Sequence, residues 1–172
     1  MLGFTPFNQH PRGTIVSLLM ESYAGYFEID PGCENAWRPG WVEYERQVFD
    51  HPDSVGVCGF VTCLREQEAC PDERVVGFAS WDPRGFPAVG LIGHNCILPA
   101  FRGNSYGKAQ VSEVLRRLKE KGFRKAAVTT GEHTFFAPAQ RMYLACGFRE
   151  VKRGFGDLYS RFRTIDYELE LG

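Results

Sequence analysis

The chain has 172 residues, the size of one domain, and this length is enough to bury most of the surface that the unfolded form exposes. Its 20 Lys and Arg residues nearly balance its 21 Asp and Glu residues, so no overall field attracts nucleic acid or an anionic membrane. Its apolar runs are far shorter than the roughly 20 residues of a membrane helix, and residues 1–10 lack the basic and apolar regions of a signal peptide. We therefore expect a cytoplasmic protein with a small partner, without nucleic acid or membrane, as a monomer or a homodimer.

Six cysteines are spread along the chain: Cys33, Cys58, Cys63, Cys70, Cys96 and Cys146. None of them forms a C-x-x-C pair, and three lie in apolar segments, where a free thiol packs as a small hydrophobic side chain. The four histidines lack neighbours at the spacing of a zinc site. We expect free thiols and no metal site.

The first part of the chain is predicted to form a strand and two helices. A short strand at residues 3–7 precedes apolar residues at helical spacing, which predict a helix over residues 12–26. Residues 27–41 contain two prolines and two glycines, so they are predicted to form a loop. A second helix is predicted over residues 40–49, and the sequence HPDS at residues 51–54 closes it.

A run of strands follows. Apolar and β-branched residues at 55–61 and 75–81, separated by a polar segment, predict an antiparallel pair. A turn at residues 82–85 leads to a strand over residues 88–98, which Pro99 ends.

A long amphipathic helix is the clearest element of the second half. Val111, Val114, Leu115 and Leu118 recur at i, i+3, i+4 and i+7, and Gly122 marks the end of the helix. Four elements complete the chain: a strand at 125–130, a helix at 138–146, and strands at 148–153 and 164–171. This order predicts one α+β domain over residues 1–172, with a mixed, largely antiparallel sheet and one parallel crossover around the long helix.

The turn between the strand and the long helix has features of an anion site. Gly103 and Gly107 allow backbone torsions closed to other residues, and successive N–H groups can point into one concavity at the start of the helix. The turn is not a nucleotide-hydrolase P-loop, because the glycine spacing is one residue short and Ala109 replaces the magnesium-binding hydroxyl. A turn that holds a phosphate or pyrophosphate and a connection that binds nothing both fit this spacing.

The segment ILPAFRGNSYGKAQV resembles the acetyl-CoA-binding motif of the GNAT-type N-acetyltransferase superfamily. Arg102, Gly103 and Gly107 match the motif, whereas Ser105 stands where the family usually has its middle glycine. The resemblance implies the fold predicted above and a cofactor site made of Ile97, Leu98, Arg102, Gly103, Asn104, Ser105, Tyr106, Gly107 and Lys108. In that site the turn amides hold the pyrophosphate, and the N–H of Ile97 or Leu98 contacts the acetyl oxygen.

The segment AQRMYLACGF is similar to a second signature of the family, A-x-x-L-Y-x-x-x-G-F. Ala139, Met142, Tyr143, Gly147 and Phe148 match it, and the family places the tyrosine beside the CoA sulfur. With a reference pKa of ~10, Tyr143 is a neutral donor that can protonate the thiolate. A purely structural tyrosine within a buried helical stripe is the alternative.

His94 is the candidate general base, because it lies on the strand before the motif and has a reference pKa of ~6.5. A surface or core histidine is the alternative, and a bulge in the strand would decide which face the side chain meets. Glu132 and His133 are weaker candidates that could simply cap the next helix or line the loop. Phe136 replaces the asparagine with which the family often contacts the pantetheine arm.

Aromatic residues gather near the segment between the two early helices. Tyr26, Phe27, Trp37 and Trp41 can wall an acceptor pocket, since the family has its substrate cleft there, or can simply pack together.

These features lead to one functional hypothesis. The resemblance implies transfer of an acetyl group from acetyl-CoA to a primary amine of a small molecule or peptide, by direct attack in a ternary complex. Tyr143 would be the acid, and the base is left open, with His94 as the first candidate. A CoA-binding module without turnover is the alternative.

Overall fold

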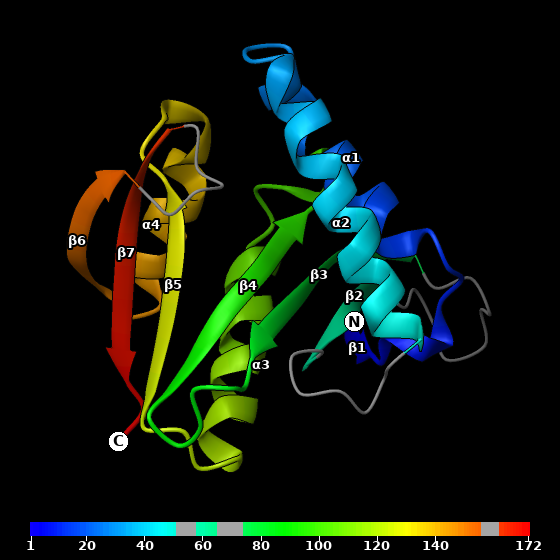
Figure 1. Cartoon of the computed structure of the whole chain (residues 1–172). Helices are drawn as coiled ribbons and strands as arrows, with labels where there is room; N and C mark the ends of the chain where they lie inside the picture. Colours follow the sequence, from blue (N-terminus) through cyan, green and yellow to red (C-terminus); the bar gives the residue numbers. More distant parts are fainter. Residues whose placement is uncertain (51–57, 65–73, 156–161) are drawn as a thin grey trace.

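The computed structural model describes residues 1–50, 58–64, 74–155 and 162–172. Within them, seven strands form one sheet in the order β1-β2-β3-β4-β5-β7-β6 (Figure 1). The strands are β1 (Leu2–Thr5), β2 (Cys58–Leu64), β3 (Arg74–Asp82), β4 (Val89–Ile97), β5 (Lys125–Gly131), β6 (Arg149–Phe155) and β7 (Arg163–Glu170). Among the strand pairs of these described ranges, only β4–β5 is parallel, which confirms the predicted α+β fold.

Helices cover both faces of the sheet. They are α1 (Thr14–Phe27), α2 (Gly32–Asp50), α3 (Tyr106–Glu120) and α4 (Ala137–Ala145), with short 3₁₀ helices η1 (Phe7–Gln9), η2 (Pro99–Phe101) and η3 (Thr134–Phe136). Within the residues that the structure describes, no helix has the length and apolar character needed to cross a membrane. The five described cysteines are thiols that form no disulfide with one another, and Cys70 lies outside the described residues.

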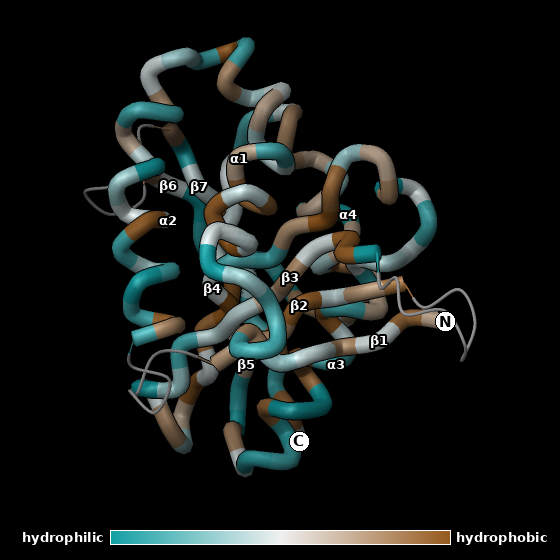
Figure 2. Tube along the Cα trace, turned by 90° about the vertical axis from the view of Figure 1, so that its right-hand side faces the viewer, coloured by the Kyte–Doolittle hydropathy of each residue, from teal (hydrophilic) through white to brown (hydrophobic). Residues whose placement is uncertain are grey.

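The face covered by α3 holds the larger core. Val111, Val114 and Leu118 of α3 are completely buried and belong to one cluster with Ile92 of β4 and Tyr167 of β7. Hydrophilic and hydrophobic residues alternate along α3 and α2 (Figure 2), as expected for helices with one buried face. The amphipathic helix predicted from the sequence is therefore confirmed.

The opposite face is covered by α1 and α2. Ile15 and Leu19 of α1 pack in one cluster with Phe78 of β3. Glu45 of α2 is buried, and its carboxylate accepts hydrogen bonds from the backbone N–H groups of Gly13 and, at 2.8 Å, Val16. Because the first N–H groups of a helix have no partner within it, Glu45 supplies the cap that α1 lacks locally.

The predicted loop at residues 27–41 is wrong. Helix α1 runs to Phe27, and α2 begins at Gly32 and continues through Pro39. A proline inside a helix removes one hydrogen bond and costs ~3 kcal/mol, but the same turns place buried Trp41 against the core. The second helix, predicted over residues 40–49, therefore begins much earlier, at Gly32. The remaining predicted elements agree with the structure to within a few residues, except that residues 51–57 and 65–73 lie outside the described part.

Two irregularities of β4 set up the site. Its pairing with β5 joins only Val89–Ile92 to Lys125–Val128, and beyond these residues the two strands diverge toward the upper end of Figure 1. On the other edge, β3 pairs Ala79 with Asn95 but Trp81 with Ile92, which is a β-bulge. The bulge turns Asn95 toward α3 and His94 toward α2, where they contact Gln110 and Tyr44 respectively.

Candidate active site

A first cavity lies where β4 and β5 diverge, beside the beginning of α3. It has a volume of about 630 Å³, and Ile97 of β4 and Tyr143 of α4 line it. From the predicted turn, its lining includes Arg102, Gly103, Ser105, Tyr106, Gly107 and Lys108. The structure thus brings the two sequence motifs together around one space.

Backbone N–H groups at the entrance of α3 are available to a ligand. In the described chain, no backbone acceptor is found for the N–H groups of residues 103–108, and the next N–H, that of Ala109, donates to Ser105 O at 3.1 Å. The positive end of the helix dipole lies at the same place. These donors suit an anionic group such as a pyrophosphate.

The charges of the first cavity favour the same ligand. Arg102, Lys108 and Arg141 contribute positive charge, and none of its lining residues in the described ranges is an Asp or Glu. Arg141 was not singled out from the sequence, because its spacing does not distinguish it from a surface arginine. Its one signal is its place two residues before Tyr143 in the second motif.

The residues of the turn differ in conformation. Gly103 has a φ of 82° and Ser105 a φ of 60°, so both are left-handed, and Ser105 is the non-glycine residue with positive φ in the described chain. Gly107 is not among the residues with positive φ, which corrects the torsional reason expected for it. A Cβ there would lie 2.9 Å from Met142 Sδ, so Gly107 instead permits the close approach of α3 and α4.

Arg102 and Asn104 hold the turn in place. Arg102 Nε donates to Ile97 O at 3.1 Å, and a terminal nitrogen of Arg102 donates to Ser22 O of α1 at 2.7 Å. Asn104 does not line the cavity, and its amide donates to Phe101 O and Arg102 O at 3.2 Å each. Both side chains therefore position the backbone amides of the turn.

Of the two N–H groups expected to face the acetyl oxygen, that of Leu98 is already used. It donates to Val76 O at 2.8 Å, and Leu98 packs in the core under α1 without lining the cavity. Successive N–H groups of a strand point to opposite edges, so the N–H of Ile97 points away from β3, toward the space beside β5. Leu98 is therefore a packing residue, and Ile97 is the available donor.

Tyr143 is buried with its hydroxyl at the cavity. Burial raises the pKa of Tyr143 to about 12, so the phenol is neutral at physiological pH. Asn95 Nδ2 donates to the Tyr143 oxygen at 3.2 Å, and in the described chain no acceptor is found for the hydroxyl hydrogen. That hydrogen is free to reach a group in the cavity.

A chain of buried hydrogen bonds fixes this orientation. Gln110 of α3 is fully buried, and its Nε2 donates to Phe78 O at 2.9 Å, so the amide nitrogen must face the strand. The same nitrogen donates to Asn95 Oδ1, while Thr62 Oγ1 donates to Gln110 Oε1. Every donor from Thr62 to Tyr143 then points toward the cavity, and bonds aligned in this way polarise one another. Local sequence patterns do not reveal this chain of hydrogen bonds, because it joins side chains from four elements, β2, α3, β4 and α4.

A second cavity, of about 810 Å³, adjoins the first on the α1 and α2 side of the sheet. Both cavities are lined by Tyr23, Gly93, Thr129, Thr130 and Phe136. The diverging strands therefore separate two spaces that meet at shared residues, an arrangement suited to two ligands that react with each other.

His94 lines the second cavity and does not line the first. Its ring packs edge-on against Tyr44 at 5.0 Å and tilted over Phe78 at 6.0 Å between centroids. Burial lowers the pKa of His94 to about 4, so the imidazole is neutral at physiological pH. A neutral ring can accept a hydrogen bond but holds a proton weakly.

The aromatic residues near the early helices divide into two groups. Trp37 and Trp41 line the second cavity, as does Phe136. Tyr26 and Phe27 lie behind them, where Tyr26 stacks on Trp37 at 5.7 Å between centroids. The expected pocket wall therefore consists of the two tryptophans, supported by the other two rings.

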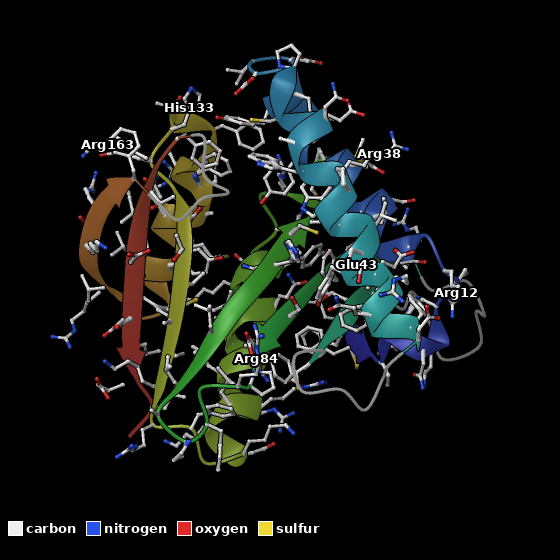
Figure 3. All side chains as sticks on the ribbon, in the orientation of Figure 1. Arg12, Arg38, Glu43, Arg84, His133 and Arg163 are labelled. Atoms are coloured by element: carbon white, nitrogen blue, oxygen red, sulfur yellow. The ribbon has the colours of Figure 1, made fainter. Side chains whose placement is uncertain are left out.

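Glu132 and His133 line neither cavity. Glu132 forms ion pairs with Arg163 at 2.6 Å and with Arg153 at 3.0 Å, and these hydrogen bonds lower the pKa of its carboxyl group. His133 Nδ1 accepts a hydrogen bond from Phe135 N at 3.1 Å and caps η3. Figure 3 shows His133 and Arg163 at the same end of the sheet. Both candidates have structural roles, and His133 caps η3 rather than the helix that follows it.

Solved structures with this fold are numerous. A Desulfovibrio desulfuricans protein assigned to the GNAT family of acetyltransferases has a TM-score of 0.74 and 17% identity, over 100% of this chain and 99% of its own. Arabidopsis thaliana NAA60, solved with a bisubstrate analogue, has a TM-score of 0.67 and 16% identity, over 99% and 98% of the two chains. A Bacillus anthracis protein assigned as a streptothricin acetyltransferase, solved with acetyl coenzyme A, has a TM-score of 0.53 and 17% identity, over 65% and 61%.

The sequence itself adds a family assignment. The comparison with curated proteins gives no match. A sequence profile described as "Acetyltransferase (GNAT) family" matches residues 15–148, which include both motifs and the residues that line the first cavity. The chain therefore belongs to the acetyltransferase (GNAT) family.

Proposed function

We propose that this protein is an N-acetyltransferase that moves the acetyl group of acetyl-CoA to a primary amine of a small molecule or peptide, by direct attack in a ternary complex. Acetyl-CoA is the co-substrate of this fold, as in the complex of the Bacillus anthracis neighbour. It supplies an activated thioester. The observation that carries the proposal is the Tyr143 hydroxyl, whose hydrogen is left free at a cavity that meets a second one.

The residues of the first cavity fit this co-substrate. The unpaired N–H groups of residues 103–108, with Lys108 and Arg141 nearby, provide donors and positive charge for the pyrophosphate. The N–H of Ile97 is the donor for the acetyl oxygen, on which negative charge develops during attack. Arg102 keeps these two sets of donors in register, because it bonds both to β4 and to α1.

Tyr143 and His94 take the two proton transfers. As the nitrogen of the acceptor forms its bond to the acetyl carbon and the C–S bond breaks, the Tyr143 hydroxyl gives its proton to the leaving sulfur. On the other side, neutral His94 accepts a hydrogen bond from the acceptor nitrogen. With a pKa of about 4, His94 does not stay protonated at neutral pH. We therefore propose that His94 passes the proton of the acceptor nitrogen on to water in the second cavity.

Replacing Tyr143 with Phe tests the role of its hydroxyl. Tyr143→Phe keeps the ring and most of its packing, so we expect kcat to fall by ~10²-fold or more while acetyl-CoA affinity stays nearly unchanged. Tyr167→Phe is the matched control, because Tyr167 packs against Tyr143 at 6.0 Å but lines neither cavity. It should retain wild-type turnover.

The pH dependence gives a second readout. The neutral phenol is the active form and its pKa is about 12, so kcat should not decline through loss of this proton at any pH below about 11. Turnover is measured from CoA thiol release with saturating amine, from pH 6 to about pH 10. Wild-type kcat in Tyr143→Phe across this range would remove Tyr143 from the mechanism, and acetyl-CoA binding without any transfer would indicate a binding module.

A further inference from the structure

Aromatic side chains form one wall of the second cavity. Its volume is about 810 Å³, and its aromatic lining residues include Tyr23, Trp37, Trp41, Phe136, Phe155 and Phe162. Trp37 lies at the centre of this wall, edge-on to Tyr23 at 5.5 Å and to Phe162 at 5.6 Å between ring centroids. Trp37 and Trp41 are 5.9 Å apart. Rings at these distances form a continuous apolar surface that can also present π-faces to a cation.

Charge in this cavity is sparse. Among the described residues that line it, Asp166 and Lys152 are the ones with a formal charge at neutral pH. They occupy paired positions on neighbouring strands, β7 and β6, yet no ion pair in the described chain includes Asp166. The described lining of this cavity therefore offers one carboxylate, beside one competing positive charge.

Asp166 lies close to the junction of the two cavities. Thr129 Oγ1 donates a hydrogen bond to Asp166 Oδ1 at 2.7 Å, and Thr129 lines both cavities. An ammonium group held by Asp166 would thus lie where the spaces meet, and the rest of the molecule would extend along the aromatic wall.

We infer that the acceptor is an amine with a single ammonium group on an aromatic or long aliphatic body, an inference that rests on the proposed function and narrows its substrate class. Such a molecule pairs its charge with Asp166 and buries its apolar body against the rings around Trp37. A polyamine or an aminoglycoside fits poorly, because each further ammonium group would lose water without meeting a carboxylate and would be repelled by Lys152.

Four probe amines test this class at saturating acetyl-CoA. 2-Phenylethylamine has one positive charge and an aromatic ring, and propylamine has one positive charge and only a short alkyl chain. Spermidine and kanamycin carry several positive charges. We expect kcat/KM for 2-phenylethylamine to exceed that for each of the other three by at least about 10-fold, since an apolar group in a fitting pocket is worth ~10- to 200-fold in discrimination.

Two variants assign the preference to named residues. Asp166→Asn keeps the shape and the bond from Thr129, and should raise KM for 2-phenylethylamine by about 10-fold with little change in kcat. Glu168→Gln is its control, because Glu168 lies two residues further along β7, pairs with Lys125 and lines neither cavity. Trp37→Leu should raise KM for 2-phenylethylamine and leave that for propylamine unchanged.

The outcomes distinguish a wrong acceptor class from a failure of N-acetyl transfer itself. Preferred acetylation of spermidine or kanamycin would overturn the inference and leave N-acetyl transfer intact. An unchanged KM in Asp166→Asn would also overturn it, because the single carboxylate would then not hold the ammonium group. If none of the amines is acetylated while acetyl-CoA still binds, the proposed function fails and this inference fails with it.

Discussion

Ser105 occupies the most constrained backbone position near the cofactor cavity. It precedes α3 with φ 60° and ψ 10°, and its side chain makes no capping hydrogen bond. A left-handed conformation costs an L-residue roughly 1–2 kcal/mol, whereas glycine adopts it freely. The serine therefore holds a strained turn, and its side chain adds no capping hydrogen bond.

Replacing this serine with glycine should stabilise the protein. Glycine loses ~0.5–1 kcal/mol of chain entropy on folding, so we expect Ser105→Gly to increase the free energy of unfolding by about 0.5–1 kcal/mol. The control is Ser112→Gly, at an exposed helical position of α3, which should destabilise by about 0.5 kcal/mol. Urea unfolding of the three proteins measures both values, and a less stable Ser105→Gly would contradict the strain.

The sequence predicted the site residues that lie in a contiguous motif. It did not predict site residues that come together only when the chain folds. Tyr143 and the turn from Arg102 to Lys108 lie in contiguous signatures, and the structure puts them around one cavity. In the sequence, Gln110 is one of several polar residues of a helix. Its role in orienting Asn95 depends on its hydrogen bond to Phe78 O, which lies far away in the sequence. The N–H groups of Ile97 and Leu98 were equal candidates from the sequence, but strand alternation turns that of Leu98 toward β3.

At the scale of elements, α2 depends on a contact that local sequence does not reveal. Two prolines and two glycines within residues 27–41 predict a loop, yet the helix continues through Pro39 because Trp41 and Glu45 make contacts with the core and with α1. Burial of side chains in the tertiary structure outweighs the local preference of proline and glycine for a loop. The bulge in β4 is likewise set by pairing with β3, so only its consequence for His94 could be anticipated.

The link between α2 and α1 can be measured. Glu45→Ala removes the acceptor of the Gly13 and Val16 N–H groups and should lower the free energy of unfolding by about 2–3 kcal/mol, because hydrogen bonds to charged groups contribute ~1.5–3 kcal/mol. Glu43→Ala removes an exposed ion pair with Arg46 on the same helix and should cost less than about 1 kcal/mol. Equal costs in chemical denaturation would show that Glu45 does not cap α1.

At the scale of the whole molecule, the main feature is that the single sheet splits between β4 and β5. Residues before Gly93 on β4 pair with β5, and beyond them the strands diverge and leave a cavity on each face. The element order and the largely antiparallel sheet were predictable, because periodicity and turn residues are local. The divergence was not predictable from the residues themselves, because it depends on how far the two distant strands stay paired.

The most direct test is a single-turnover reaction with enzyme in excess over acetyl-CoA and a panel of 2-phenylethylamine, spermidine, kanamycin and a short peptide with a free N-terminus. Mass spectrometry of the amines and thiol determination are made on the same samples. The account predicts one N-acetylated amine for every CoA thiol released, with both appearing at the same rate. Binding is checked separately, because acetyl-CoA at a hundredfold excess over its Kd should stabilise the fold by ~2.7 kcal/mol. If acetyl-CoA binds in this way but stays intact or is only hydrolysed in the presence of the amines, the account is contradicted.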